Sequence, residues 1–142
     1  MATERDSLSR IKVADVMTRR LVIADLNASV HDLACKMRKN RVSSVVILDS
    51  DRIAGIVTEH DLAEKVLAAS LDPAKTRAGD VMSAPVETIS TEADIDEAAR
   101  IMRDRRIKKL VAIKDDSVAG IITSFDIVVA EPIIRLLAEK RQ

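Results

Sequence analysis

The chain has 142 residues, and 47% of them are hydrophobic, so it can bury the core of one compact domain or of two small halves. Its 23 basic and 23 acidic side chains cancel, which argues against a surface for duplex DNA or RNA. The only aromatic residue is Phe125, so single-stranded nucleic acid would lack stacking platforms. One cysteine, Cys35, suits a reducing compartment, and no apolar run reaches membrane-spanning length. The first 25 residues are too charged for a signal peptide, so we expect a cytoplasmic protein without membrane or nucleic-acid partners.

After a polar lead-in over residues 1–10, the chain contains a unit of about 50 residues. A short apolar turn comes first, followed by an extended piece and by a helix that Ser29 caps. A strand at 45–48, a polar turn and a second strand then predict a hairpin. The second strand ends at Thr58, where another helix begins.

The same order of elements returns 65 positions later. Its helix is capped by Asp94, its first hairpin strand lies at 110–113, and its second hairpin strand ends at Thr123. Aligning 13–62 with 78–127 gives 15 identical residues in 50 pairs, whereas composition alone gives roughly three or four. The sequence therefore contains an internal duplication.

These units divide the chain into repeat 1 at 11–70, a linker at 71–77, repeat 2 at 78–130 and a C-terminal helix at 131–142. Pro132 is expected in the first turn of that separate, apolar tail helix, which needs a surface to pack on. A single small βαββα unit can hardly bury its own apolar face. We therefore predict an α+β fold in which two tandem βαββα repeats pack sheet to sheet about a pseudo-twofold axis.

Each second hairpin strand runs into a Thr-x-x-Asp motif, Thr58 to Asp61 and Thr123 to Asp126. One interpretation is a capping box, in which the Thr hydroxyl and the Asp carboxylate satisfy free amides of the first helical turn. The other is a ligand site: the helix N-terminus and the Thr hydroxyl bind a phosphate, and the carboxylate accepts hydrogen bonds from two ribose hydroxyls. Residue types alone leave both open.

A glycine lies three residues before each Thr, Gly55 in repeat 1 and Gly120 in repeat 2. It indicates a bulge or close strand packing, or else room for a nucleoside against the backbone. The sequence does not choose between these interpretations.

The two Asp-Val-Met turns at 15–17 and 80–82, the helix, the hairpin and Gly-Ile-[Val/Ile]-Thr-x-x-Asp resemble the CBS domain, named after cystathionine beta-synthase. Two in tandem resemble a CBS pair, or Bateman module, over about residues 11–130. The resemblance implies binding of AMP, ADP, ATP or S-adenosylmethionine, regulation of attached or partner proteins, and dimer formation. No further domain accompanies the repeats in this sequence, so we expect a stand-alone CBS-pair protein.

The resemblance also implies roles for particular residues. It places ribose at the two Asp residues of the motifs, phosphate near the two Thr residues, and adenine beside the extended pieces. The residues that enter the first hairpin strand differ, serines in repeat 1 and lysines in repeat 2, so the sites should differ in phosphate preference unless these groups are only a solvated charged edge. Arg41 and Arg106 are secondary candidates. The predicted nucleotide-binding residues are Thr58, Asp61, Thr123, Asp126, Ile23, Ala24, Ser43, Ser44, Thr88, Ile89, Lys108 and Lys109.

The expected function is an adenosine-nucleotide-sensing regulatory protein, not an enzyme, which binds its ligand between the repeats and signals to an unidentified partner, as a homodimer. No cofactor is required, and the two histidines, His31 and His60, lack a matching ligand set for a metal. The alternatives are a ligand-free dimerisation or scaffold module, and a sensor of S-adenosylmethionine. Catalysis ranks last, because the sequence offers no general-base pair, nucleophile or metal cluster.

Overall fold

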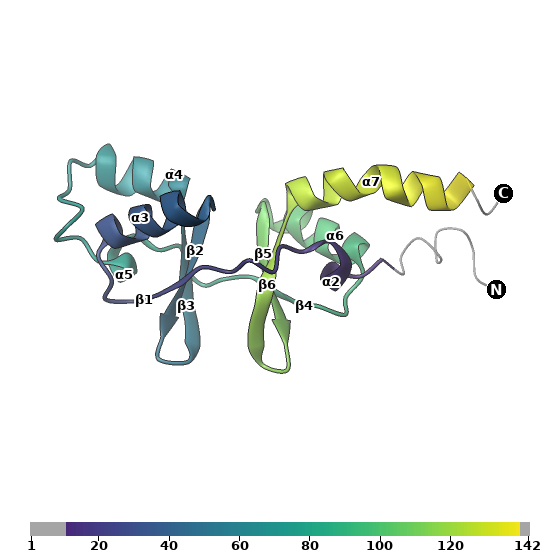
Figure 1. The fold of residues 1–142 in the computed structure, drawn as a ribbon, viewed down its shortest axis with the longest axis horizontal. Helices are drawn as coiled ribbons and strands as arrows, with labels where there is room; N and C mark the ends of the chain where they lie inside the picture. Colours follow the sequence, from purple (N-terminus) through teal and green to yellow (C-terminus); the bar gives the residue numbers. More distant parts are fainter. Residues whose placement is uncertain (1–10, 140–142) are drawn as a thin grey trace. The chain divides into compact units, whose positions relative to one another are not determined.

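The structure is a computed structural model that describes residues 11–139. The elements follow each other in an order that repeats (Figure 1). Those up to the middle of the chain are α2 (Val13–Val16), β1 (Ile23–Asp25), α3 (Val30–Asn40), β2 (Ser44–Asp49), β3 (Arg52–Thr58), α4 (Glu59–Asp61) and the π-helix η1 (Leu62–Leu67). The remaining ones are α5 (Ala78–Val81), β4 (Thr88–Ser90), α6 (Ile95–Arg105), β5 (Lys109–Lys114), β6 (Ser117–Thr123) and α7 (Ser124–Glu139). The predicted α+β class and the two βαββα repeats are confirmed.

The chain forms two compact units, which we call the middle unit (Leu21–Val86) and the terminal unit, whose described residues are 11–20 and 87–139. The middle unit contains the three-stranded sheet β1-β2-β3, in which β1 is parallel and β3 antiparallel to β2. Alternation along the strands turns Val45, Ile47 and Val57 toward one face, where they pack with Val30 and Leu33 of α3 in a buried cluster.

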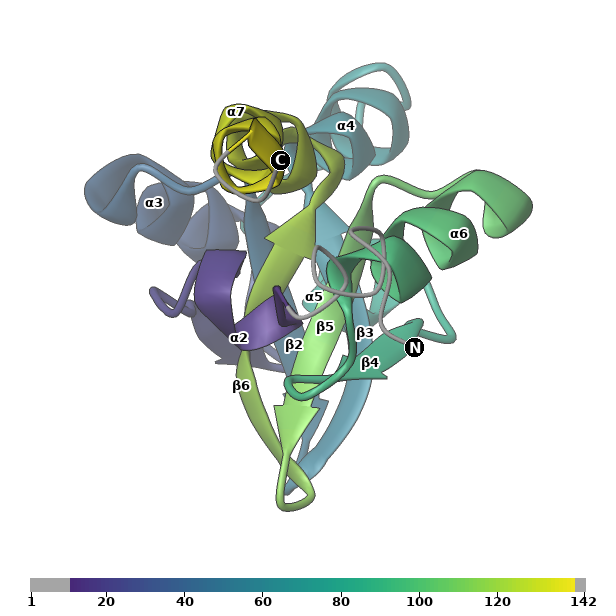
Figure 2. The same ribbon diagram turned by 90° about the vertical axis from the view of Figure 1, so that its right-hand side faces the viewer.

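The terminal unit repeats this arrangement with the sheet β4-β5-β6, which Figure 2 shows together with α2, α6 and α7. Leu110, Ala112 and Ile122 of its sheet form a second buried cluster with residues of α6 such as Ala98 and Met102. The two clusters share no residue, so each sheet has its own aliphatic core.

The leading turn of each repeat belongs to the unit that holds the sheet of the other repeat. Helix α2 precedes β1 in sequence but lies in the terminal unit, where Thr18 pairs with Ile121 of β6. Helix α5 precedes β4 but lies in the middle unit, where Ser83 pairs with Ile56 of β3. The compact units are therefore composed differently from the consecutive repeats at 11–70 and 78–130.

Glycine is required where these turns meet the sheets. A Cβ atom on Gly55 would lie 2.9 Å from the carbonyl oxygen of Ser83, and one on Gly120 would lie 2.5 Å from that of Thr18. Such separations are too short for an alanine unless the backbone moves. Of the two interpretations that the sequence left open, close packing of another strand accounts for both glycines.

The helices that follow β3 and β6 differ. After β3, the short helix α4 continues as the π-helix η1, whereas α7 is one helix from Ser124 to Glu139. The separate tail helix expected from Pro132 is therefore wrong: the helix that starts at the Thr123 motif runs through the proline. Proline removes one backbone donor and crowds one carbonyl, and the rest of the hydrogen-bond ladder can continue past it. The lead-in 1–10 and residues 140–142 lie outside the described part. Over residues 11–139, no helix has the length and apolarity to cross a membrane.

Candidate functional site

The start of the first hairpin strand and the end of the second meet at one edge of each sheet. In the middle unit, Ser44 pairs with Thr58, and the N–H of Glu59 donates to the carbonyl of Ser43 over 3.0 Å. In the terminal unit, Lys109 pairs with Thr123, and the N–H of Ser124 donates to the carbonyl of Lys108 over 2.9 Å. We call Ser43, Ser44, Thr58 and Asp61 the middle edge, and Lys108, Lys109, Thr123 and Asp126 the terminal edge. The fold thus brings four of the predicted residues together at the middle edge and four others at the terminal edge.

Both Thr-x-x-Asp motifs are capping boxes. Thr58 Oγ1 accepts from the N–H of Asp61 over 3.2 Å, and Asp61 Oδ2 accepts from the N–H of Thr58 over 2.9 Å. The corresponding distances between Thr123 and Asp126 are 3.1 and 2.8 Å. The capping interpretation is confirmed. Each cap uses only one oxygen, Oδ2, of the Asp carboxylate.

The other oxygen of Asp61 is also engaged. Asp61 Oδ1 accepts from Ser83 Oγ over 3.2 Å and lies 3.1 Å from Lys65 Nζ, and the residue is only 5% exposed. Burial raises the pKa of this carboxyl, but the hydrogen bonds from Thr58 and Lys65 outweigh burial and hold the pKa below its usual value. At neutral pH, Asp61 is therefore an ionised carboxylate whose charge is compensated inside the protein.

Asp126 has the same motif and a different environment. It is half-buried, and among the described residues no side chain donates to its Oδ1. Alignment at the offset of 65 pairs Lys65 with Ala130 and Ser83 with Thr18. Ala130 cannot donate a hydrogen bond, and among the described residues the Thr18 hydroxyl donates none to Asp126. Oδ1 of Asp126 therefore lacks the two donors that Oδ1 of Asp61 has.

The sequence-based set omits Lys65 and Ser83. Lys65 and Ala130 lie three positions beyond the aligned segments 13–62 and 78–127, and only the fold shows that the lysine reaches Asp61. Ser83 lies 22 positions from Asp61 and reaches it only because its turn packs in the middle unit.

The four residues predicted to face adenine are divided between the two faces of the strands. Ala24 and Ile89 are 7% and 6% exposed and belong to the cores, whereas Ile23 is 44% exposed and Thr88 is also exposed. Strand alternation produces this division, because successive side chains point to opposite faces. Lys36 Nζ donates to the carbonyl of Ile23 over 3.0 Å, so that acceptor is already engaged.

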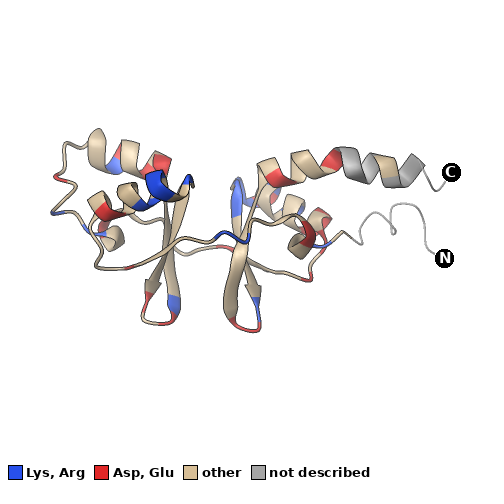
Figure 3. Cartoon of the chain, viewed as in Figure 1, with Lys and Arg blue, Asp and Glu red and all other residues tan. Residues whose placement is uncertain are grey.

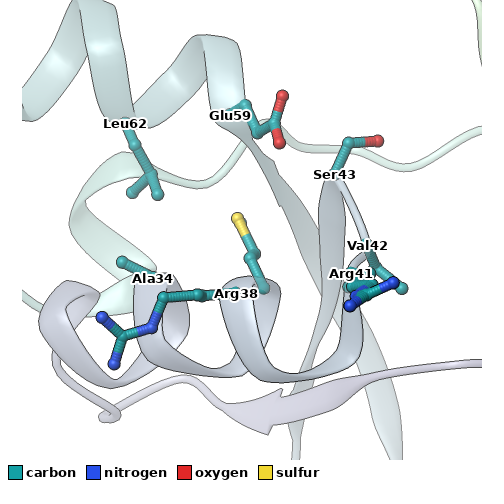
Figure 4. Close-up of a pocket in the computed structure, with 8 residues that line it drawn as sticks. Ala34, Arg38, Arg41, Val42, Ser43, Glu59 and Leu62 are labelled. Atoms are coloured by element: carbon teal, nitrogen blue, oxygen red, sulfur yellow. The ribbon is translucent and has the colours of Figure 1, made fainter.

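A pocket of about 580 Å³ adjoins the middle edge and includes Ser43. Figure 4 shows Arg38 and Arg41 on one side of it, and Glu59 and Leu62 on the other. The remaining lining residues are Ala34, Met37 and Val42. The pocket combines apolar side chains with two arginines and one acid. Ser43 is the one middle-edge residue that lines it, so the Asp61 carboxylate is not part of this pocket.

A pocket of about 730 Å³ in the terminal unit is lined by Thr88 and Ile89. Its charged lining residues are all acidic, namely Glu92, Glu97, Asp115 and Asp116. None of the four terminal-edge residues lines it. A phosphate would meet like charge in this pocket. Thr88 pairs with Val111 of β5, two residues after Lys109 of the terminal edge.

Basic residues gather at the ends of the helices that precede the two edges, and Figure 3 shows them at the end of α3 and the start of β5. Arg41 and Arg106 each end a helix in the left-handed conformation, with φ of 54° and 56°. Glycine adopts this conformation at lower free-energy cost than arginine. Both repeats nevertheless place an exposed guanidinium beside the hairpin start.

The described residues contain no cluster of three or more His, Cys, Asp or Glu that could hold a metal ion. His60 is paired with Glu64 over 2.6 Å on the surface of the middle unit.

Fold and edges define a tandem repeat module of two α+β units. The family model of the CBS domain matches residues 13–68 and 78–132. The chain belongs to the CBS domain family, and its two matches make it a CBS pair.

Among curated proteins, the chain is similar to the uncharacterized protein MK0525 of Methanopyrus kandleri, with 34% identity over 86% of this chain and 63% of that protein. Two further relatives from Methanocaldococcus jannaschii are covered over only 31% and 40% of their lengths. The chain therefore spans less than two thirds of these relatives.

Two solved structures are informative. The hexameric CBS-CP12 protein from bloom-forming cyanobacteria has a TM-score of 0.80 and 25% identity, over 88% of this chain and 73% of that one. The CBS domain pair of protein MJ0100, in complex with 5′-methylthioadenosine and S-adenosyl-L-methionine, has a TM-score of 0.75 and 27% identity, over 85% and 95%.

Proposed function

We propose that this CBS pair is a regulatory module that binds an adenosine-containing ligand at a Thr-x-x-Asp edge and signals its presence to a partner protein. The observation that carries the proposal is the terminal edge. There, Asp126 keeps one carboxylate oxygen without a donor among the described residues, beside Thr123, Lys108 and Lys109, the first residue of β5.

This arrangement suits a ribose phosphate. A carboxylate oxygen accepts hydrogen bonds from the vicinal hydroxyls of ribose, which a free phosphate does not offer. The phosphate of the same ligand would meet the positive end of α7 and the ammonium groups of Lys108 and Lys109. A carboxylate alone would repel phosphate, so the lysines are part of the proposed site.

The relatives support the chemistry of the ligand. The similar domain pair of protein MJ0100 was solved with two adenosine-containing compounds, one of which is S-adenosyl-L-methionine. That ligand has no phosphate: it carries a sulfonium group and the carboxylate of its methionine, so it offers the lysines one carboxylate in place of a phosphate. AMP, ADP or ATP makes use of both the carboxylate and the lysines and is our leading choice, with S-adenosylmethionine as the second.

We propose binding and signalling, not catalysis, because the four residues that define each edge include no histidine or cysteine. His60, which lies between Thr58 and Asp61 in the sequence, is exposed and paired with Glu64. A ligand regulates only to the extent that it binds one conformation of the protein more tightly than another. We further propose a homodimer as the signalling form, and light scattering with and without ligand would check it. An unidentified partner protein would then distinguish the two conformations.

Thermal unfolding with a nucleotide panel tests the proposal. The full chain is heated with adenosine, AMP, ADP, ATP and S-adenosylmethionine, and with GMP and UMP as controls for the base. A ligand at 100 times its Kd adds about 2.7 kcal/mol to the free energy of unfolding, which raises Tm by several degrees. The absence of a shift with every adenosine compound would overturn the proposal and favour the ligand-free scaffold.

A further inference from the structure

The carboxylate of Asp61 is saturated with hydrogen bonds. Its Oδ2 accepts from the N–H and the Oγ1 of Thr58 over 2.9 and 3.1 Å, and its Oδ1 accepts from Ser83 and Lys65. A carboxylate has about four lone-pair sites, so this one retains no acceptor for the two hydroxyls of a ribose.

Lys65 is fixed in this place by a second bond. Its Nζ also donates to the carbonyl of Val81 in α5 over 3.0 Å, so the ammonium group bridges Asp61 and the end of the α5 turn. The lysine belongs to η1, whose π-helical turns replace the α-helical turns found at the same place in the terminal unit. Because Asp61 is nearly buried, this pair is screened by solvent much less than an ion pair on the surface.

The terminal edge differs in charge as well as in hydrogen bonding. At the offset of 65, Ser43 and Glu59 of the middle unit are replaced by Lys108 and Ser124. Ser44 is also replaced by Lys109, and Lys65 by Ala130. Two added lysines, one removed glutamate and one lost lysine make the terminal edge more favourable for an anion by two charges. The hydrogen bonding also differs. Lys36, whose Nζ donates to the Ile23 carbonyl, is replaced at this offset by the apolar Ile101.

We propose that Lys65 is an internal counter-ion that closes the middle edge, so that the chain binds one adenosine ligand, at the terminal edge only. The ammonium group occupies the acceptor that a ribose hydroxyl would use. This inference deepens the proposed function and rests on it. Lys65 is then the specificity-determining residue that distinguishes the two edges of a duplicated sequence.

Binding stoichiometry of the full chain tests the inference. Equilibrium dialysis with labelled AMP, and in parallel with labelled S-adenosylmethionine, gives the number of sites per chain. We expect one equivalent for the unchanged chain and an affinity at least about tenfold lower for Asp126→Asn.

Two substitutions of Lys65 test whether this lysine closes the middle edge. Lys65→Met keeps the aliphatic stem, which preserves packing, while Lys65→Ala removes both stem and charge. Either variant should bind two equivalents, because ribose hydroxyls can replace the lost ammonium on Asp61. Lys75→Ala, on the linker of the same unit, is the matched control and should bind one equivalent.

Three binding results would contradict the inference in different ways. Two equivalents on the unchanged chain, one of which Asp61→Asn removes, would overturn the inference and leave the proposed function standing. One equivalent in both Lys65 variants, each folded as judged by cooperative melting, would overturn the role of Lys65. Failure of the unchanged chain to bind either probe would overturn the proposed function, and the inference with it.

Discussion

Lys65 Nζ lies 3.1 Å from Oδ1 of Asp61, a carboxylate whose side chain is 7% exposed. Removing this carboxylate leaves Lys65 with only the Val81 carbonyl, Ser83 without its acceptor and the capping box of α4 without its carboxylate. We expect Asp61→Ala to lower the free energy of unfolding by about 2–4 kcal/mol, and Asp126→Ala by about 1 kcal/mol, because Asp126 serves mainly as a cap. Urea unfolding of both variants measures the difference, and equal losses would contradict this account of Asp61.

The pH dependence of stability provides a second test of the same carboxylate. The pKa of Asp61 is lower in the folded chain than the value of about 3.9 usual for an unfolded chain. Its contribution to stability is therefore fully present above pH 4 and is lost as the pH falls through the folded pKa. Asp61→Asn should lower Tm at pH 7 more than at pH 3.

The control for this pH series is Asp51→Asn, in the exposed turn between β2 and β3. It should alter Tm little at either pH. A Tm difference between Asp61→Asn and the unchanged chain that is equally large at both pH values would contradict the assignment.

Much of the fold was predictable because its signals are local. Strand alternation, the polar residues that precede the helices and the offset of 65 identify each element from neighbouring residues. Ser29 caps α3 as predicted, whereas Asp94 holds the N-cap position of α6 without a side-chain cap hydrogen bond and pairs with Lys12 instead. The Thr-x-x-Asp motifs also follow from local chemistry, and the fold adds the hairpin pairing that brings Ser44 to Thr58 and Lys109 to Thr123.

The exchange of the leading turns was not predictable from the repeat. A turn that begins each repeat gives the same sequence pattern whether it packs on its own sheet or on that of the other repeat. The glycines are the one local sign of which sheet each turn packs on: the Ser83 carbonyl approaches Gly55, and the Thr18 carbonyl approaches Gly120. The hydrogen bond from Ser83 to Oδ1 of Asp61 was not predictable for the same reason, because Ser83 belongs to an exchanged turn.

Gly55 and Gly120 should not tolerate a methyl group. A Cβ on Gly120 meets the Thr18 carbonyl at 2.5 Å, and one on Gly55 meets the Ser83 carbonyl at 2.9 Å, both backbone atoms that cannot turn aside. We expect each change to alanine to cost about 1–3 kcal/mol of stability, the larger loss at Gly120. Gly79→Ala is the control, since its nearest contact is Cδ1 at the tip of the Leu26 side chain. Chemical denaturation of the three variants would refute the close-packing account if Gly79→Ala were the most damaging.

Thr91 has a buried hydroxyl in the terminal unit. The residue is 2% exposed, and its Oγ1 has no hydrogen-bond partner among the described residues. Thr91→Val keeps the shape and removes the desolvated hydroxyl, so we expect a gain of about 1 kcal/mol in the free energy of unfolding. Thr76→Val is the matched control: its buried Oγ1 donates to the Asp72 carbonyl over 2.8 Å, so the same change should destabilise. Calorimetry that showed both variants destabilised alike would indicate that Thr91 has a partner.

The proposed function predicts that the terminal edge prefers a phosphate because of Lys108, an exposed residue whose carbonyl accepts from the first amide of α7. If its ammonium group meets the ligand phosphate, Lys108→Ala should weaken AMP binding about fivefold to tenfold and leave adenosine binding unchanged, because adenosine has no phosphate. Lys114→Ala is the control, since Lys114 pairs with Ser117 at the opposite end of the β5-β6 hairpin. Calorimetric titration with AMP and with adenosine measures both affinities. At higher salt, screening should lower the ratio of AMP affinity to adenosine affinity of the unchanged chain toward the ratio of the variant. An equal loss for both ligands would mean that Lys108 supports the edge without contacting the phosphate.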